Sequence, residues 1–520
     1  MAYTLFQGGS SLQIMDTSGT LTTLTLPTGI TLNSTARPRF AVFGRYVVVV
    51  NSPSRPITVD PEGTVRVLTP RGPRTKPTLS TGTGSLTGTY KVRQTYIVWD
   101  SDGTIISESG MGVESLSGAV AGQALAVAGL DLATDTVSAT RLYRNSTNGS
   151  VYFPWIDVDG NTTTSIEDDL ADASLELASA PLLGDPPHFS HIGEYRERLF
   201  GVGNTDIDAI RYSEAGMMYA WPEINRIIIP REGADDRGIT GILARRDALA
   251  VARQNALVEI KGDRTANFSV VRLSGEIGVE ADDSIAQFRD VIYFLAKDGV
   301  YTWSNSGIQS ISDGKVRSWF TTDTYFNRGR LRYAVGRIDP LTSRYQLLLS
   351  AAGSSDLDRW IEYDIKDQTW WGPHKTTDFT PSWMTTILDA NSLPMVVIGS
   401  STGFFYKEQD TRTDGTATGI ALDVEGKFHD MNSPDIMKYF GQLSLLSKIQ
   451  ASGTLSVIPY VGELSASAGT TISASMTAGR EKLRRLGTGR FCKLVFQNST
   501  AGVDCEIYGF DLPFHELGRR

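Results

Sequence analysis

The sequence SIAQFRDVIYFLAKDGVYTWSNSGIQSIS, residues 284–312, alternates short apolar runs with turn residues. Val291–Leu295 is an apolar run of strand length, and Val300–Trp303 reads as its return strand. Gly299 closes the turn between them, where a glycine can take a positive φ without steric cost. A second glycine turn and a third short strand complete the stretch. It therefore predicts a meander of antiparallel strands.

Apolar strands of the same kind recur along the chain. From Leu199 onward their spacing is 43 to 55 residues, close to the roughly 40 to 50 residues of one four-stranded propeller blade. The reference residues are Val48, Leu199, Leu249, Ile292, Leu347 and Val396. They predict a β-propeller with six recognisable blades. Aromatic residues on the return strands are expected to pack blade against blade rather than to stack on sugars; they are Tyr212, Tyr301, Trp303, Tyr363, Trp370, Trp371 and 404–406.

The first step of the repeat, from Val48 to Leu199, is 151 residues long and breaks the period. Removing the 113 residues of 71–183 restores it. Prolines bracket this segment, as is typical of domain boundaries; they are Pro70, Pro73, Pro77, Pro181, Pro186 and Pro187. We therefore predict that 71–183 is an inserted, independent module.

The inserted segment carries six or seven short strands at close turn spacing, which predicts an immunoglobulin or fibronectin III-like β-sandwich. Gly82–Gly88 lacks the Lys-Ser/Thr of a phosphate-binding loop, and we expect a flexible linker there. Asp100–Gly103 and Asp157–Asn161 contain the acids of calcium loops, but each lies where a hairpin must turn. We interpret both as turns.

The predicted fold is all-β, with four parts in chain order. Residues 1–70 are the first propeller blade, 71–183 the inserted sandwich, and 184–410 the remaining blades. Residues 411–520 are β-rich, either as a second small sandwich or as the closure of the propeller. The strand pattern is compatible with both, so it also leaves open a further blade after Asp410.

The two cysteines, Cys492 and Cys505, lie on segments that read as paired strands of one hairpin. In that register they are too far apart for a disulfide, although both thiols fall on one apolar face. We expect buried free thiols in a protein folded in a reducing cytoplasm.

Composition limits the function classes. The chain has 520 residues and a formal net charge of −9, which argues against a large phosphate-neutralising face. Its first residues lack the basic and apolar regions of a secretory signal, and no apolar run approaches the roughly 20 residues of a membrane span.

Groups that could carry chemistry are scattered. The five histidines have no metal-ligand spacing; they are His188, His191, His374, His429 and His515. Acidic clusters at 167–169, 235–236 and 282–283 are interpreted as solvated turns rather than a glycosidase pair. One basic cluster, Arg480, Lys482, Arg484, Arg485 and Arg490, is interpreted as a solvated or subunit-facing edge, with nucleic acid as the alternative. We predict no catalytic, cofactor or metal site.

Several longer stretches resemble the tail nozzle or hub proteins of short-tailed bacteriophages, also called tail tubular protein B. They are DVIYFLAKDGVYTW, RWIEYDIKDQTWWGP, HFSHIGEYRERLFGVGNTDIDAIRYSEAG and KLVFQNSTAGVDCEIYGFDLPFHELGRR. The resemblance covers most of the chain as an order of modules, without a short diagnostic motif. It supplies no catalytic residue.

The resemblance implies a structural virion protein, synthesised in the host cytoplasm. It implies a ring, most simply of six copies, below the portal and adaptor and in contact with tail fibres or a tail needle. The lumen of such a ring retains and then conducts the genome without specific DNA binding. The alternative is a glycan-binding or glycosidase propeller, but the repeated Ser-x-Asp-x-Gly-x-x-Trp boxes of sialidases are absent from the sequence.

Overall fold

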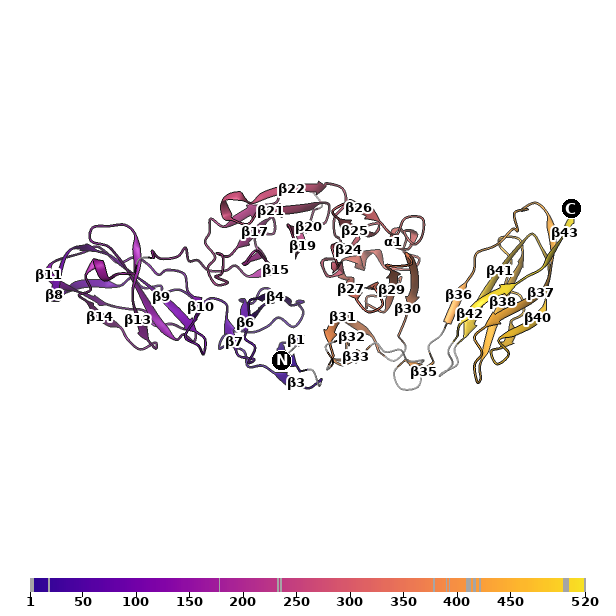
Figure 1. The fold of residues 1–520 in the computed structure, drawn as a ribbon, viewed down its shortest axis with the longest axis horizontal. Coiled ribbons are helices and arrows are strands. Elements are labelled where there is room, and N and C mark those ends of the chain that lie inside the picture. Colours follow the sequence, from indigo (N-terminus) through magenta and orange to yellow (C-terminus); the bar gives the residue numbers. More distant parts are fainter. Residues whose placement is uncertain are drawn as a thin grey trace. The chain divides into compact units, whose positions relative to one another are not determined.

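The computed structural model describes residues 4–16, 19–176, 178–231, 233, 236–376, 379–389, 391, 393–407, 413–414, 418–419, 422–498 and 505–518. The chain divides into two compact units. The first contains Met1–His374, Ser382–Gly399 and Gly403–Tyr406, and the second contains Lys375–Pro381, Ser400–Thr402 and Lys407–Arg520. The fold is all-β (Figure 1).

Seven antiparallel sheets of the first unit form a β-propeller, and each sheet keeps its strands in chain order. Five sheets have four strands: β4 (Arg39–Phe43), β5 (Tyr46–Val50), β6 (Ile57–Val59), β7 (Val65–Val67); β15 (Phe189–Tyr195), β16 (Arg198–Gly203), β17 (Ala209–Tyr212), β18 (Arg226–Ile228); β19 (Ile239–Ala244), β20 (Leu249–Arg253), β21 (Leu257–Lys261), β22 (Ser269–Ser274); β23 (Ala286–Phe288), β24 (Val291–Ala296), β25 (Gly299–Ser304), β26 (Gly307–Ser310); β27 (Val335–Asp339), β28 (Arg344–Leu349), β29 (Arg359–Asp364), β30 (Thr369–His374). Two have three strands: β1 (Thr4–Gly8), β2 (Ser11–Met15), β3 (Leu21–Thr23); and β31 (Pro381–Leu388), β32 (Pro394–Ser400), β33 (Phe405–Lys407).

The short helices lie in connections between these strands. They are η2 (Thr265–Asn267), η3 (Asp282–Ser284), α1 (Ser318–Thr321) and η4 (Arg328–Tyr333). No helix within the described ranges is long and apolar enough to cross a membrane.

The propeller closes through its N-terminal strands. On one side, Phe6 of β1 packs against Phe405 of β33, with ring centroids 4.6 Å apart. On the other side, Leu12 of β2 shares a buried cluster with Val49 of β5. The prediction of one blade in 1–70 was therefore wrong: this segment forms two sheets, and the first of them completes the ring. The strands after Asp410 form no blade among the described residues.

The apolar runs identified in the sequence are the second strands of their sheets. All six reference residues are buried, because these strands are covered on both faces by neighbouring sheets. The fourth strands β18, β22, β26 and β30 are mostly exposed, and the first strands contact one another across adjacent sheets. The first strands therefore line the interior of the ring. Gly299 has no positive φ, contrary to expectation; a Cβ there would instead collide with Ser312 Oγ.

The insertion is a β-sandwich of seven strands. One sheet has the order β10-β9-β12-β13 and the other β14-β11-β8, and η1 (Asp172–Ser174) follows. The strands are β8 (Thr78–Tyr90), β9 (Val92–Trp99), β10 (Ile105–Glu108), β11 (Gly118–Ala128), β12 (Ala139–Asn145), β13 (Tyr152–Asp159) and β14 (Ser165–Asp168). The expected linker at Gly82–Gly88 lies inside β8, so that prediction was wrong. A Cβ at Gly84 would lie 2.7 Å from Ala124 N, and the glycine permits this close approach of β11.

The insertion shares a core with the propeller. Val98 and Ile106 belong to the same buried cluster as Val48, Leu199 and Trp221 of the propeller. Ser107 Oγ also donates a hydrogen bond to the carbonyl of Leu68 at 2.7 Å. The module is thus docked on the propeller rather than tethered to it.

The second unit is a further β-sandwich. Its sheets have the orders β36-β41-β38-β39 and β40-β37-β42, with β43 also paired to β37; a short hairpin of β34 and β35 precedes them. The strands are β34 (Thr413–Asp414), β35 (Thr418–Gly419), β36 (Leu422–Glu425), β37 (Met437–Ser447), β38 (Thr454–Gly462), β39 (Ile472–Ser475), β40 (Arg480–Gly489), β41 (Phe491–Asn498), β42 (Ile507–Asp511) and β43 (Phe514–Gly518).

Cys492 and Cys505 are not on paired strands, because β41 belongs to one sheet and β42 to the other. That register was wrong. Within the described residues neither cysteine forms a disulfide, and both contribute to the same core. Burial raises the pKa of the Cys492 thiol to about 12, so this thiol is protonated at neutral pH.

Candidate functional site at the centre of the propeller

Charged side chains from several sheets converge inside the ring. Arg39 is the first residue of β4, and Arg37 lies two residues before this strand. His191 lies on β15, and Asp282 and Asp283 lie on η3, which is one residue before β23. We call these five residues the polar centre. The first strands line the ring interior, and the sheets that begin with β4 and β23 are separated by two others. The contacts between Arg37 or Arg39 and the two aspartates therefore cross the ring.

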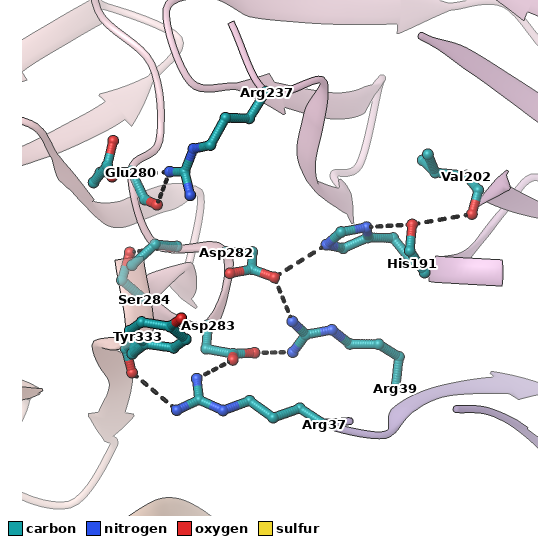
Figure 2. Close-up of polar contacts among 12 residues, drawn as sticks. Arg37, Arg39, His191, Val202, Arg237, Glu280, Asp282, Asp283, Ser284 and Tyr333 are labelled. Atoms are coloured by element: carbon teal, nitrogen blue, oxygen red, sulfur yellow. Dashed lines mark hydrogen bonds and ion pairs between the residues drawn. The ribbon is translucent and has the colours of Figure 1, made fainter. Parts of the chain in front are cut away.

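The polar centre is a chain of alternating charges (Figure 2). Arg37 and Arg39 both pair with the carboxylate of Asp283. Arg39 Nη2 lies 2.7 Å from Asp282 Oδ2, and His191 Nε2 lies 3.3 Å from the same oxygen. Each charge therefore has an opposite charge beside it.

Helix η4 and strand β31 also hold Arg37 in place. Its Nη2 donates a hydrogen bond to the carbonyl of Tyr333, on η4, at 2.9 Å. Its guanidinium lies over the ring of Trp383, on β31, at 5.1 Å from the centroid, a geometry that favours a cation–π interaction. Strands β4, β15 and β31 and the connecting helices η3 and η4 thus contribute to one network.

Burial and charge set the protonation states. Burial raises the pKa of Asp282, but the hydrogen bond from His191 and the charge of Arg39 outweigh it, so this pKa lies well below its usual range. Burial lowers the pKa of His191, and Asp282 only partly offsets this effect. At neutral pH Asp282 is therefore a carboxylate and His191 is neutral.

The other predicted groups are dispersed. His188 binds the carbonyl of Pro53, His374 packs on Trp360, and His429 and His515 lie in the second unit. Among the described residues, no three His, Cys, Asp or Glu side chains gather as a metal site. The sequence spacing did not reveal that His191 would meet Asp282, because 91 residues separate them.

The acidic clusters were expected to be solvated turns, but one acid of each cluster is buried, whereas Glu167 and Asp169 are exposed as expected. Asp168 pairs with Arg144 at 2.6 Å and Asp236 with Arg253 at 2.7 Å, and all four side chains are fully buried. Asp283 is also buried, while Asp235 lies outside the described residues. Sequence reasoning treated these acids as surface groups because their arginine partners are distant in the chain.

The first suspected calcium loop is a turn, but Asp157 and Asp159 of the second lie within strand β13, and the chain bends only after them. Asp100 Oδ1 accepts hydrogen bonds from the backbone N–H groups of Asp102 and Thr104, and Asp157 pairs with Arg141 at 2.6 Å. Of the aromatic return-strand residues, Tyr212, Tyr301, Trp303 and Tyr363 are buried, as packing between blades requires. Trp371, Phe404 and Phe405 are 54%, 66% and 41% exposed and depart from that expectation.

A cleft of about 730 Å³ lies where the insertion joins the propeller. Its walls include Arg55, Arg71, Arg74, Asp185 and His188. Its volume falls within the range of small-ligand sites. Arg55 is held by two contacts of 2.9 and 3.0 Å to Asp135 of the insertion. This ion pair links the two modules at the edge of the cleft.

Comparisons with known proteins give only partial likenesses. No protein-family model and no curated protein matches the chain. BamB from Moraxella catarrhalis is similar at 10% identity and a TM-score of 0.32, over 77% of this chain and 94% of that one. YCF48 bound to D1 peptide is similar at 9% identity and a TM-score of 0.27, over 62% and 96%. Kluyvelomyces marxianus Hsv2 is similar at 7% identity and a TM-score of 0.28, over 55% and 71%. The description of the fold therefore depends on the sheet topology given above.

Proposed function

We propose that the protein is a structural component of the tail of a short-tailed bacteriophage. Copies of the chain form the nozzle or hub ring below the portal and adaptor, through which the genome is retained and ejected. The observation that supports this most is the order of modules: a propeller, a sandwich inserted after sheet β4–β7, and a second sandwich after β33. The resemblance in the sequence implies the same order.

The polar centre supports a mechanical role over a catalytic one. Asp282 and Asp283 are neutralised by arginines, and the low pKa of Asp282 is unsuited to a general acid near neutral pH. Their contacts tie opposite sides of the propeller together. We infer that the centre keeps the ring of sheets rigid, as a part under load during DNA ejection requires.

The charge of the chain suits a conduit. The formal net charge of −9 means that a channel wall built from these subunits repels the DNA backbone, which lowers its residence on the wall. A cyclic arrangement closes by heterologous contacts between identical subunits. The proposed neighbours are the portal and adaptor above the ring, and fibres or a needle around it.

The test is electron microscopy and native mass spectrometry of the full chain mixed with the portal and adaptor of its phage. We expect a ring of about six copies joined to the adaptor. A chain that stays monomeric in assembled tails would refute the proposal. Turnover of a glycan that is lost on replacing a single carboxylate would favour the glycosidase alternative instead.

A further inference from the structure

One sheet of the second unit has two unpaired edges. Strands β40 and β42–β43 flank β37, and neither pairs with any other described strand. β42 and β43 lie end to end along one side of β37. An exposed edge of this length offers unpaired backbone groups to another strand.

The two edges differ in charge. The basic edge, β40, carries Arg480, Lys482, Arg484 and Arg485 against one acid, Glu481. The acidic edge, β42–β43, carries Asp511 and Glu516 and no lysine or arginine. Glu481 accepts a hydrogen bond from the backbone of Ser475, so it is already occupied.

Exposed apolar side chains lie on the acidic edge. Tyr508 and Leu517 are each 58% exposed, Phe510 is 46% exposed and Phe514 is 37% exposed. These four side chains lie within twelve residues of sequence, on strands where a soluble protein normally places polar groups. Such a concentration is typical of a surface that another chain covers.

The charges select one kind of pairing. A two-fold pairing of like edges would oppose basic groups to basic groups or acids to acids, which is unfavourable. A basic edge against an acidic edge pairs opposite charges. Since β40, β42 and β43 are all antiparallel to β37, the two edges run parallel to each other. A second copy can thus continue the sheet in the same direction.

The strand register also aligns opposite charges on the two edges with the same residue of β37. Ser444 of β37 faces Lys482 on one side and Asp511 on the other. An unshifted continuation of the sheet therefore places Lys482 of one copy opposite Asp511 of the next. Asp511 also contacts Arg480 of its own chain at 3.6 Å, but both side chains are more than 60% exposed, and such a pair contributes little.

We propose that the basic edge of one copy pairs with the acidic edge of the next as parallel strands, and that this contact joins the subunits head to tail. Closure of the contact into a ring rests on the proposed function. The contact itself follows from the edges alone. The partner is therefore a second copy of this chain.

The test uses two complementary variants of the full chain. The first is Lys482→Glu with Arg485→Glu, and the second is Asp511→Lys with Glu516→Lys. Each alone then carries two edges of the same sign. We expect the dissociation constant for self-association, measured by sedimentation velocity at low salt with and without the portal and adaptor, to rise at least tenfold for each variant. An equimolar mixture should regain the parent affinity, because every basic edge again meets an acidic one.

Controls separate folding and net charge from pairing. Circular dichroism checks that each variant is folded, and the single substitutions Lys482→Glu and Glu516→Lys replace any double variant that is not. Arg264→Glu, on an 82% exposed side chain of the other unit, matches the charge change of the single substitution Lys482→Glu and should leave association unchanged.

The outcomes distinguish the contact from the proposed function. If the variants assemble as well as the parent, or the mixture does not recover, the contact is refuted while a ring made by other surfaces remains. If the parent never associates, even in assembled tails, both ideas fail. Zero-length carbodiimide cross-linking of mixed light and heavy chains adds an independent measurement, with a Lys482–Asp511 or Lys482–Glu516 link between the two isotopes expected.

Discussion

Asp283→Asn removes the central charge of the polar centre while keeping the shape of the side chain. The Asp283 side chain is 2% exposed and pairs with both Arg37 and Arg39, which are 29% and 20% exposed. The substitution leaves these two guanidinium groups beside each other without the carboxylate between them. We therefore expect it to destabilise the propeller.

The size of the effect follows from burial. Removing one partner of a buried ion pair typically costs about 3 to 5 kcal/mol. Water can reach the two arginines, and the asparagine oxygen can still accept a hydrogen bond from one of them. We therefore expect the lower end, about 3 kcal/mol in the free energy of unfolding. Arg37→Met combined with Asp283→Asn should cost at least about 1 kcal/mol less than the sum of the single changes, because the partners share one interaction.

Urea unfolding followed by tryptophan fluorescence measures this free energy. Asp313→Asn is the matched control, because Asp313 pairs with Arg317 at 3.0 Å but both side chains are about half exposed. Exposed pairs contribute at most about 1 kcal/mol. If Asp283→Asn costs no more than Asp313→Asn, the polar centre does not hold the ring together.

Three further predictions concern pH, the insertion and salt. His191 is buried and its pKa is lowered, so below about pH 6.5 the unfolded chain binds a proton that the folded chain does not. The free energy of unfolding should therefore fall with decreasing pH. Urea titrations between pH 7 and 5 should show that His191→Gln flattens this dependence. Replacing 71–183 by a short Gly/Ser bridge removes Val98 and Ile106 from the shared cluster, which should lower the free energy of unfolding by about 3 to 6 kcal/mol. Thermal circular dichroism should still show one cooperative transition of the propeller. Insoluble protein would show that the insertion is part of the propeller core. Raising salt from about 0.1 to 1 M shortens the screening length from about 10 to 3 Å. Sedimentation should then show that the subunits separate, while circular dichroism shows no loss of fold. Assembly that resists salt would count against pairing through charged edges.

The sequence was sufficient for the local architecture of the propeller. Second strands are buried on both faces, so their apolar runs at Leu199, Leu249 and Ile292 stand out from the rest of the chain. The spacing of these runs therefore predicted both the blades and the insertion. The N-terminal sheet was missed because β1 to β3 are short and one side of the sheet is partly exposed, which leaves no comparable apolar run.

The polar centre could not be predicted, because it depends on closure of the ring. Arg37 and Asp283 are 246 residues apart, and no local pattern relates them. An arginine two residues before a strand and an acid pair before another strand each look like ordinary surface residues. The same reasoning explains Asp236 and Arg253, whose buried pairing was mistaken for a solvated turn.

The polar centre also constrains where DNA can pass. Its contacts cross the interior of the propeller and involve strands of three sheets and two connecting helices, so a single propeller is not an open conduit at this level. Under the proposed function, the genome channel then lies between copies, so the proposed contact between subunits is essential to that function. Pairing through the edges of the second unit covers the basic side chains of β40, the densest basic cluster in the sequence. The same pairing covers Asp511 and Glu516 of the acidic edge, so the remaining surface keeps the net acidic charge of the chain, and a channel wall of this charge favours sliding of DNA over binding.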